Sequence, residues 1–317
     1  MRILLDKRNF TPHDWQVYRR GQKGLGGSDV ATILGLNPWK TAFTLWLEKT
    51  GQTEPPTLDN EYIEWGNLLE PVIREKFAKE TGFEVIENHY VMAHDEHDFM
   101  VANIDGEVLD PDEDGWGVLE IKTTSERNKG EWEEGPPNHY HLQIQHYLAV
   151  MNYNYAYVAV LIGGNHFKYF KIYRDDYVID SIISAEMEFM QLVEKKIAPE
   201  ISGQEADSNY LAATYPEASD DEGFLRADLE ALAIRYIEIQ TELKTLGEEA
   251  NYIKNKIKQE AKEIKVLKSD KIRVSMPNVR KVIFDSKAFA ADHPSLYEEY
   301  KRKESNYRNF TVLYRRE

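Results

Sequence analysis

The segment GVLEIKTTS, residues 117–125, limits the possible folds because it has the composition of a buried strand but carries two charges. Its apolar side chains, among them Leu119 and Ile121, predict a strand inside a hydrophobic core. Side chains alternate between the two faces of a strand, so Glu120 and Lys122 share one face. The fold must either solvate this pair as a surface ion pair or give it a chemical role.

A second acidic residue, Asp105, stands at the end of the apolar run VANIDG. A turn joins the two predicted strands, so we expect them to pair antiparallel and to bring Asp105 beside Glu120. Two carboxylates beside a lysine make a hard oxygen-ligand site for Mg²⁺ or Mn²⁺, to which the carbonyl of Ile121 could add a third ligand. Lys122 could orient or deprotonate a metal-bound water.

Two predicted helices carry further candidates. The helix in EWGNLLEPVIREKF is expected to begin at Asn67, with Glu70 completing a capping box and Pro71 in the first turn. Glu70 is therefore either a capping residue or an additional metal ligand. In the helix HLQIQHYLAVMN, Gln143 and Tyr147 are four residues apart and share a face. They either line a partly buried surface or hold the lysine and the water.

The order of the predicted elements indicates an α/β or α+β core. Helices, a β-meander, a helix, a β-hairpin and a final helix follow one another in residues 1–200, which we expect to form one domain. Residues 201–223 are polar and acidic and predict a linker. Residues 224–317 predict a helical arm with a β-rich, basic tail.

A heptad pattern runs through the predicted arm. Its apolar side chains alternate in steps of four and three residues: Leu225, Leu229, Leu232, Tyr236, Ile239, Leu243, Leu246, Ala250, Ile253 and Ile257. This spacing is typical of a coiled coil. The helix could pair within a homo-oligomer, fold back as a helical hairpin at Gly247, or serve as an arm for a partner protein.

Composition excludes several classes of site. The 317 residues include no cysteine, which excludes structural disulfides, cysteine-ligated zinc and iron–sulfur clusters. No apolar run has the length of a membrane span and the N-terminus does not resemble a signal peptide, so we expect a soluble cytoplasmic protein without membrane contact. A net charge of −16 argues against nucleic-acid binding by the surface as a whole, although a basic channel would leave this total negative.

Taken in order, the motifs resemble those of a nuclease superfamily. They match the PD-(D/E)xK set, in the form with a glutamine–tyrosine helix that is found in RecB and lambda exonuclease. The matching residues are Glu70, Asp105, Glu120, Ile121, Lys122, Gln143 and Tyr147. The segments GLGGSDVATILGLNPWKTAFTLW and EWGNLLEP are similar to those of the YqaJ-type phage recombinase family. The resemblance covers about residues 10–195.

The resemblance implies a restriction-endonuclease-like fold, with a central mixed sheet flanked by helices. Here residues 1–200 would form the catalytic domain, followed by a coiled-coil or hairpin extension with short strands. It also implies a Mg²⁺-dependent deoxyribonuclease, with Mn²⁺ as a substitute, that hydrolyses linear duplex DNA from 5′ to 3′. The resulting 3′ single strands would pass to a single-strand annealing recombination protein. A phage or prophage protein of this kind would act in the bacterial host cytoplasm.

The resemblance also implies roles for individual residues. The implied metal ligands are Glu70, Asp105, Glu120 and the backbone carbonyl of Ile121. Lys122 would activate the attacking water, and Gln143 and Tyr147 would hold this lysine, the water and the DNA backbone.

An N-terminal arginine and serine would grip the 5′ phosphate of the DNA. Arg19 or Arg20, with Ser28, match these family positions. Ser28 is expected to be the N-cap of a helix whose free N–H groups favour a phosphate, and an arginine adds a fork-shaped donor. The arginine–serine spacing is longer here than in the family, and the turn between Asp105 and Glu120 is longer than in lambda exonuclease.

Alternative functions use the same residues differently. The fold could act as a single-strand or flap nuclease, as an endonuclease, or as a catalytically silent DNA-binding adaptor. The ring-shaped trimer of lambda exonuclease also suggests a homo-oligomer. The turn DPDEDG begins like a calcium-binding EF-hand loop, but the twelfth position, which requires glutamate, is Ile121. We therefore expect a solvated hairpin turn there.

Overall fold

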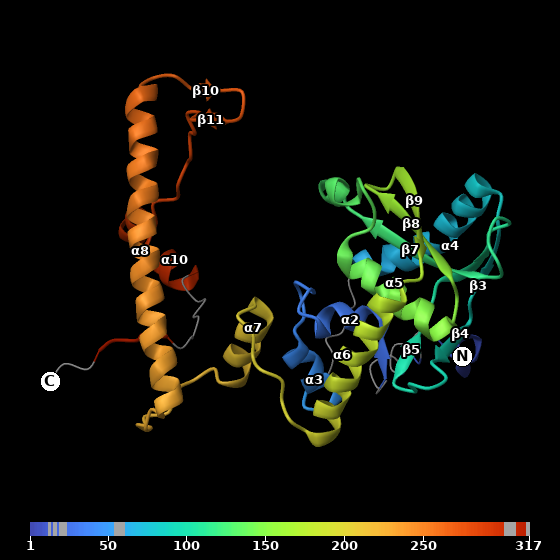
Figure 1. Ribbon diagram of the computed structural model, residues 1–317. Helices are drawn as coiled ribbons and strands as arrows, with labels where there is room; N and C mark the ends of the chain where they lie inside the picture. The colour runs from blue at the N-terminus through green and yellow to red at the C-terminus, as the bar shows by residue number, and fades with distance from the viewer. Residues whose placement is uncertain (12–13, 15–17, 19–23, 54–60, 301–308, 315–317) are drawn as a thin grey trace. The chain divides into compact units, whose positions relative to one another are not determined.

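The computed structural model describes residues 1–11, 14, 18, 24–53, 61–300 and 309–314 (Figure 1). The chain divides into two compact units, Met1–Leu211 and Ala212–Glu317. The first unit contains two mixed sheets with helices, and the second is built around one long helix. Across the residues described, no helix has both the length and the apolar composition needed to cross a bilayer.

A five-stranded mixed sheet lies at the centre of the first unit (Figure 1). In spatial order its strands are β3 (Glu84–Glu87), β6 (Gly106–Leu109), β7 (Gly117–Thr124), β8 (Tyr155–Ile162) and β9 (His166–Tyr173). β7 and β8 pair in parallel, whereas the other neighbours are antiparallel. β8 is buried along almost its whole length, which accounts for its continuous apolar sequence.

Helices cover both faces of this sheet (Figure 1). On one face, α4 (Glu61–Thr81) packs Ile73 and Phe77 against apolar residues of β7 and β8. On the other face, α5 (Asn138–Met151) and α6 (Asp176–Lys195) close the larger core. The predicted architecture, a mixed α/β fold with a mixed sheet flanked by helices, is confirmed.

A second, four-stranded sheet contains the N-terminal segment. Its order is β1 (Arg2–Asp6), β4 (Tyr90–Ala93), β5 (Met100–Ala102) and β2 (Leu25–Gly26). The segment DFMVANIDGEVLD forms two strands, because β5 belongs to this sheet and β6 to the central one. The intervening residues, which end with Asp105, cross from one sheet to the other.

Side chains of β8 and β9 hold the acidic turn between β6 and β7. Asp110 is buried and accepts hydrogen bonds from the hydroxyl of Tyr157 at 2.7 Å and the ammonium of Lys171 at 2.6 Å. The same ammonium pairs with Glu113 at 2.6 Å. The turn therefore joins two strands, as expected of a hairpin, but its first carboxylate is internally paired rather than solvated.

The start of α4 differs from the prediction. The helix already begins at Glu61, so Asn67 lies inside it and is not an N-cap, and Pro71 is an interior residue. A capping box requires a non-helical backbone at its first residue. Here residues 61–66 are already helical, so the helix continues through that position.

Helix α7 (Glu205–Thr214) lies within the segment that was expected to be a linker. Its Asp207 is buried and accepts hydrogen bonds from the hydroxyls of Thr41 at 2.5 Å and Ser202 at 2.7 Å. Thr41 is the N-cap of α3 (Ala42–Lys49). This part of the acidic segment is therefore packed onto the first unit.

The second unit is centred on α8 (Ala227–Ala261), an unbroken helix of 35 residues. At 1.5 Å per residue it is about 52 Å long. The hairpin at Gly247 is therefore wrong. The predicted β-rich tail is also only partly correct. In the part of the tail that the structure describes, there are two three-residue strands and two short helices: β10 (Val266–Lys268), β11 (Arg273–Ser275), α9 (Ser286–Asp292) and α10 (Pro294–Tyr300).

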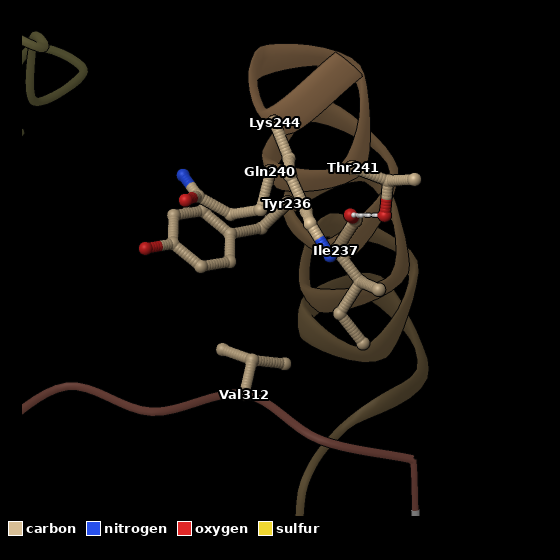
Figure 2. A pocket seen from close by; sticks show the side chains of 6 residues that line it. All are labelled: Tyr236, Ile237, Gln240, Thr241, Lys244 and Val312. Carbon is tan, nitrogen blue, oxygen red and sulfur yellow. Dashed lines mark hydrogen bonds between the residues drawn. The ribbon is translucent and has the colours of Figure 1, made fainter. Parts of the chain in front are cut away.

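The heptad residues of α8 are largely exposed. Tyr236 is covered in part by Phe310, whose ring centroid is 5.3 Å away. A shallow pocket lies between the helix and this tail, lined by Tyr236, Ile237, Gln240, Thr241, Lys244 and Val312 (Figure 2). No carboxylate lines this pocket, so it is not a candidate for the predicted chemistry.

Candidate active site

The candidate carboxylates lie where the ladder between β6 and β7 ends. Gly106 pairs with Leu119, and the preceding residue, Asp105, accepts a hydrogen bond from the N–H of Ile121 at an N···Oδ2 distance of 2.7 Å. A side chain thus takes the place of the next strand residue. The arrangement brings Asp105 close enough to Glu120 for its charge to raise the pKa of Glu120. The predicted convergence of these two acids is present.

One oxygen of Glu120 is held by two donors. Lys122 Nζ lies 2.5 Å from Glu120 Oε1, and the side-chain amide of Gln143 donates to the same oxygen at 2.9 Å. The other oxygen, Oε2, is buried and has no hydrogen-bond partner among the described residues. Strand β7 and helix α5 thus bring Glu120, Lys122 and Gln143 together, as predicted. One oxygen of Glu120 is left without a hydrogen bond from the described residues.

Helix α5 approaches this point closely because α2 (Gly27–Ile33) begins with a glycine. Gln143 donates to the hydroxyl of Tyr147 at 3.0 Å, so the predicted pair does share one face. A Cβ added at Gly27 would come within 2.8 Å of the Tyr147 ring and 2.9 Å of Gln143. Gly27, the second glycine of the pair in GLGGS, therefore has a packing role that was not predicted.

Glu70 reaches the site from α4 but is already paired. Arg74, one turn later, donates to the Glu70 carboxylate and to the carbonyl of Asp105 at 3.0 Å. It also lies 3.3 Å from a carboxylate oxygen of Glu87. Arg74 was missed from the sequence, although its spacing of four residues from Glu70 is a recognisable ion-pair signal.

Lys7, in the short 3-10 helix η1 (Lys7–Asn9), is a second unpredicted cation. Its ammonium donates to the side-chain carbonyl of Asn103 at 2.8 Å. Burial lowers the pKa of Lys7, while the charges of Asp105 and Glu70 oppose this shift. No sequence signal links Lys7 to the site, because the contact joins two segments that are 96 residues apart.

The acids of the site resist simultaneous ionisation. Burial, and then the charge of Asp105, raises the pKa of Glu120 to about 8 and that of Glu70 to about 7. Burial also raises the pKa of Asp105. For Lys122, burial acts to lower the pKa, but the charges of Glu120 and Asp105 outweigh it and the net shift is upward. A bound cation would favour the ionised acids.

The residues match the chemistry of a hard divalent metal. Mg²⁺ prefers carboxylate and carbonyl oxygens, and the unpartnered Oε2 of Glu120 is such an oxygen. The described residues nevertheless contain no group of three acidic or histidine side chains that already forms a metal cage. Instead, Arg74 holds Glu70 and Lys122 holds Glu120. The donor set is present, but its members are paired with protein cations.

The expected 5′-phosphate residues are only partly described. Arg19 and Arg20 lie outside the described residues. Ser28 is exposed in the first turn of α2, next to Gly27. The N-cap is Gly26, so the prediction that Ser28 is the N-cap is wrong: the side chain of Asp29, not that of Ser28, accepts from the Gly26 N–H.

Comparison with known proteins identifies the family. The family model of the YqaJ-like viral recombinase domain matches residues 14–154, a range that includes all the candidate site residues except Lys7. The chain is also 35% identical over 317 residues to the uncharacterized protein YqaJ of Bacillus subtilis, covering 98% of this chain and 97% of that protein. The chain belongs to the YqaJ-like viral recombinase family. The predicted resemblance to YqaJ proteins is confirmed, and the shared length includes the α8 arm.

Other similarities of this YqaJ-family chain are more limited. It is 33% identical over 75 residues to protein D345L of African swine fever virus, which covers 24% of this chain and 21% of the viral protein. Among solved structures, the alkaline exonuclease of Laribacter hongkongensis has 20% identity and a TM-score of 0.47, covering 64% of this chain and 98% of that one. A phage-related exonuclease from Haemophilus somnus has 16% identity and a TM-score of 0.39, covering 55% and 96%.

Proposed function

We propose that this YqaJ-family protein is a metal-dependent deoxyribonuclease that degrades linear duplex DNA from its ends, in the 5′-to-3′ direction, and leaves 3′ single strands for recombination. The arrangement at Glu120 supports this proposal most directly. One oxygen of Glu120 is fixed by Lys122 and Gln143, and the other is buried and unpartnered among the described residues beside Asp105. A buried carboxylate oxygen without a hydrogen-bond partner is expected where a cation binds.

The proposed ligands of Mg²⁺ or Mn²⁺ are Glu70, Asp105, Glu120 and the carbonyl of Ile121. When bound, the metal would supply Lewis acidity and lower the pKa of a water. The protein side chains have separate tasks. Gln143 holds the Glu120 carboxylate, and Tyr147 fixes the amide of Gln143. Lys122, as an ammonium, would orient the water and stabilise negative charge that develops on the phosphate.

A digestion experiment tests this function. Linear duplex DNA labelled at either end, with and without a 5′ phosphate, is incubated with the full chain and Mg²⁺ or Mn²⁺, beside covalently closed circular DNA. We expect nucleotides to be released from the 5′ ends of linear DNA only, and this release to be lost in Glu120→Ala and Lys122→Ala. Cleavage of circles would instead indicate an endonuclease, and release confined to single strands or flaps would change the substrate class.

A catalytically silent DNA-binding adaptor is the alternative that one observation favours. Arg74 forms an ion pair with the Glu70 carboxylate, which reduces the number of acidic groups that are free to bind a metal. The adaptor function predicts that DNA is bound but left intact with either metal. Intact DNA of every form under these conditions would remove the nuclease proposal.

A further inference from the structure

Trp39 has the most exposed tryptophan side chain among the described residues. It lies in the connection between α2 and α3 and is 75% exposed, compared with 59% for Trp65, whereas Trp46 and Trp132 are buried. Its position is nevertheless fixed: the backbone N–H of Trp39 donates to the side chain of Asn37 at 2.9 Å. A large aromatic surface is therefore held in solvent by an ordered turn.

The ring of Trp39 begins a row of aromatic contacts that leads to Lys122. Trp39 lies edge-on to His139, with the ring centroids 6.3 Å apart and an interplanar angle of 87°. His139 and Tyr140 have centroids 4.1 Å apart. The ammonium of Lys122 lies 4.8 Å from the centre of the Tyr140 ring. We call Trp39, His139 and Tyr140 the aromatic row.

The aromatic row is supported by a buried tryptophan. Tyr140 packs on the buried ring of Trp132, which ends the 3-10 helix η2 (Glu126–Trp132), at a centroid distance of 5.5 Å. Lys168 donates to the carbonyl of Trp132 at 3.0 Å and so anchors it to β9. Burial, and then the positive charge of Lys122, lowers the pKa of His139.

We propose that the aromatic row is a base-stacking platform for unpaired nucleotides of the strand whose phosphate lies at Lys122, with Trp39 as the stacking surface. This rests on the proposed nuclease function and deepens it by assigning how the end of the strand is held. Base stacking on aromatic rings tolerates any sequence, because every base has a π-face. The row also links an exposed ring to the catalytic lysine without a gap.

A binding experiment in EDTA tests the platform separately from cleavage. Fluorescence anisotropy of a labelled single-stranded oligonucleotide, and of a duplex with a short overhang, is measured with the full chain. Loss of one stacked base is worth about 5- to 150-fold in affinity, so Trp39→Ala should weaken binding within that range. Trp39→Phe should retain most of the affinity. Tyr177→Ala, which removes an aromatic ring that is 89% exposed on α6, should change nothing.

An abasic-site scan distinguishes stacking from a structural effect. A single abasic substitution is moved along the oligonucleotide. We expect one position at which it weakens binding by the wild type but has no further effect on Trp39→Ala. The platform is overturned if Trp39→Ala binds every substrate as tightly as the wild type, or if the abasic penalty is the same in both proteins. Such a result alongside normal cleavage leaves the nuclease function intact. Intact DNA in the digestion experiment, alongside a Trp39-dependent abasic effect, removes only the nuclease function.

Discussion

The carboxylate of Asp105 accepts a hydrogen bond from the backbone N–H of Ile121. It thereby takes the place of a strand residue where the ladder between β6 and β7 ends. Asp105→Asn keeps an oxygen that can accept this hydrogen bond but removes the charge. We therefore expect a folded protein whose nuclease activity falls by more than about 100-fold, because a proposed metal ligand is lost. Digestion assays and thermal melting measure the two effects. Unchanged activity would exclude Asp105 from the metal site.

The metal-free protein should become less stable as the pH rises through the neutral range. The pKa of Glu120 is raised to about 8 and that of Glu70 to about 7. Because the folded state binds these protons more tightly than the unfolded chain, their stabilising contribution is complete below about pH 4.5 and is lost as pH rises toward 8. Melting temperatures in EDTA between pH 5 and 9 should show the decline, and Glu120→Gln should reduce it. A wild-type decline no steeper than that of Glu120→Gln contradicts this assignment.

Gly27→Ala should disturb the packing of α2 on α5. The added methyl group would lie within 2.8 Å of the Tyr147 ring, so one of the two helices must move. We expect a loss of about 1–3 kcal/mol in the free energy of unfolding, together with reduced nuclease activity. Gly26→Ala is the matched control, since a Cβ there meets no atom within 4 Å among the described residues. Urea denaturation of both variants checks the prediction, which fails if they are equally stable.

A buried hydrogen bond between His146 and Glu186 joins α5 to α6. His146 Nδ1 lies 2.8 Å from Glu186 Oε1, and His146 Nε2 lies 3.0 Å from the carbonyl oxygen of Val101. Burial acts to lower the pKa of His146, but Glu186 outweighs it and the net shift is upward. Glu186→Ala should therefore cost about 3–5 kcal/mol by leaving a buried histidine without its partner. If denaturation near pH 6 shows less than about 1 kcal/mol, the pair is not ionic.

The exposed heptad residues of α8, which we call its seam, should determine the oligomeric state. Leu232 and Leu246 both lie on it and are more than half exposed. If the seam forms a coiled coil between copies, replacing both residues with glutamate should yield a monomer. A chain that ends near residue 220 should be monomeric as well. Light scattering of the three proteins provides the test, and a monomeric wild type would favour a partner protein instead.

The convergence of the central acids was predictable because it depends on short-range rules. Strand alternation places Glu120 and Lys122 on one face, a single turn brings back Asp105, and helical spacing aligns Gln143 with Tyr147. These relationships require no knowledge of distant segments. The similarity to YqaJ proteins adds that the chain belongs to one family over almost its whole length.

Contacts between distant segments were not predictable in the same way. Lys7 and Asn103 meet only because β1 and β5 share a sheet, and nothing in either local sequence encodes that meeting. The start of α4 was misplaced because the Asn67–Glu70 pattern also fits the interior of a helix. Helix α7 was missed because its acidic sequence resembles a linker, whereas the burial of Asp207 in the structure shows that it is packed.

The hydrogen bond from Thr41 to Asp207 affects the order in which parts of the protein fold during synthesis. The two residues are 166 positions apart, and Thr41 caps one of the first helices of the chain. During synthesis the N-terminal helices therefore emerge long before the residue that completes their packing. Non-local contacts of this kind form late, after the loop between them has closed. The first unit is complete only once the chain has been synthesised through α7.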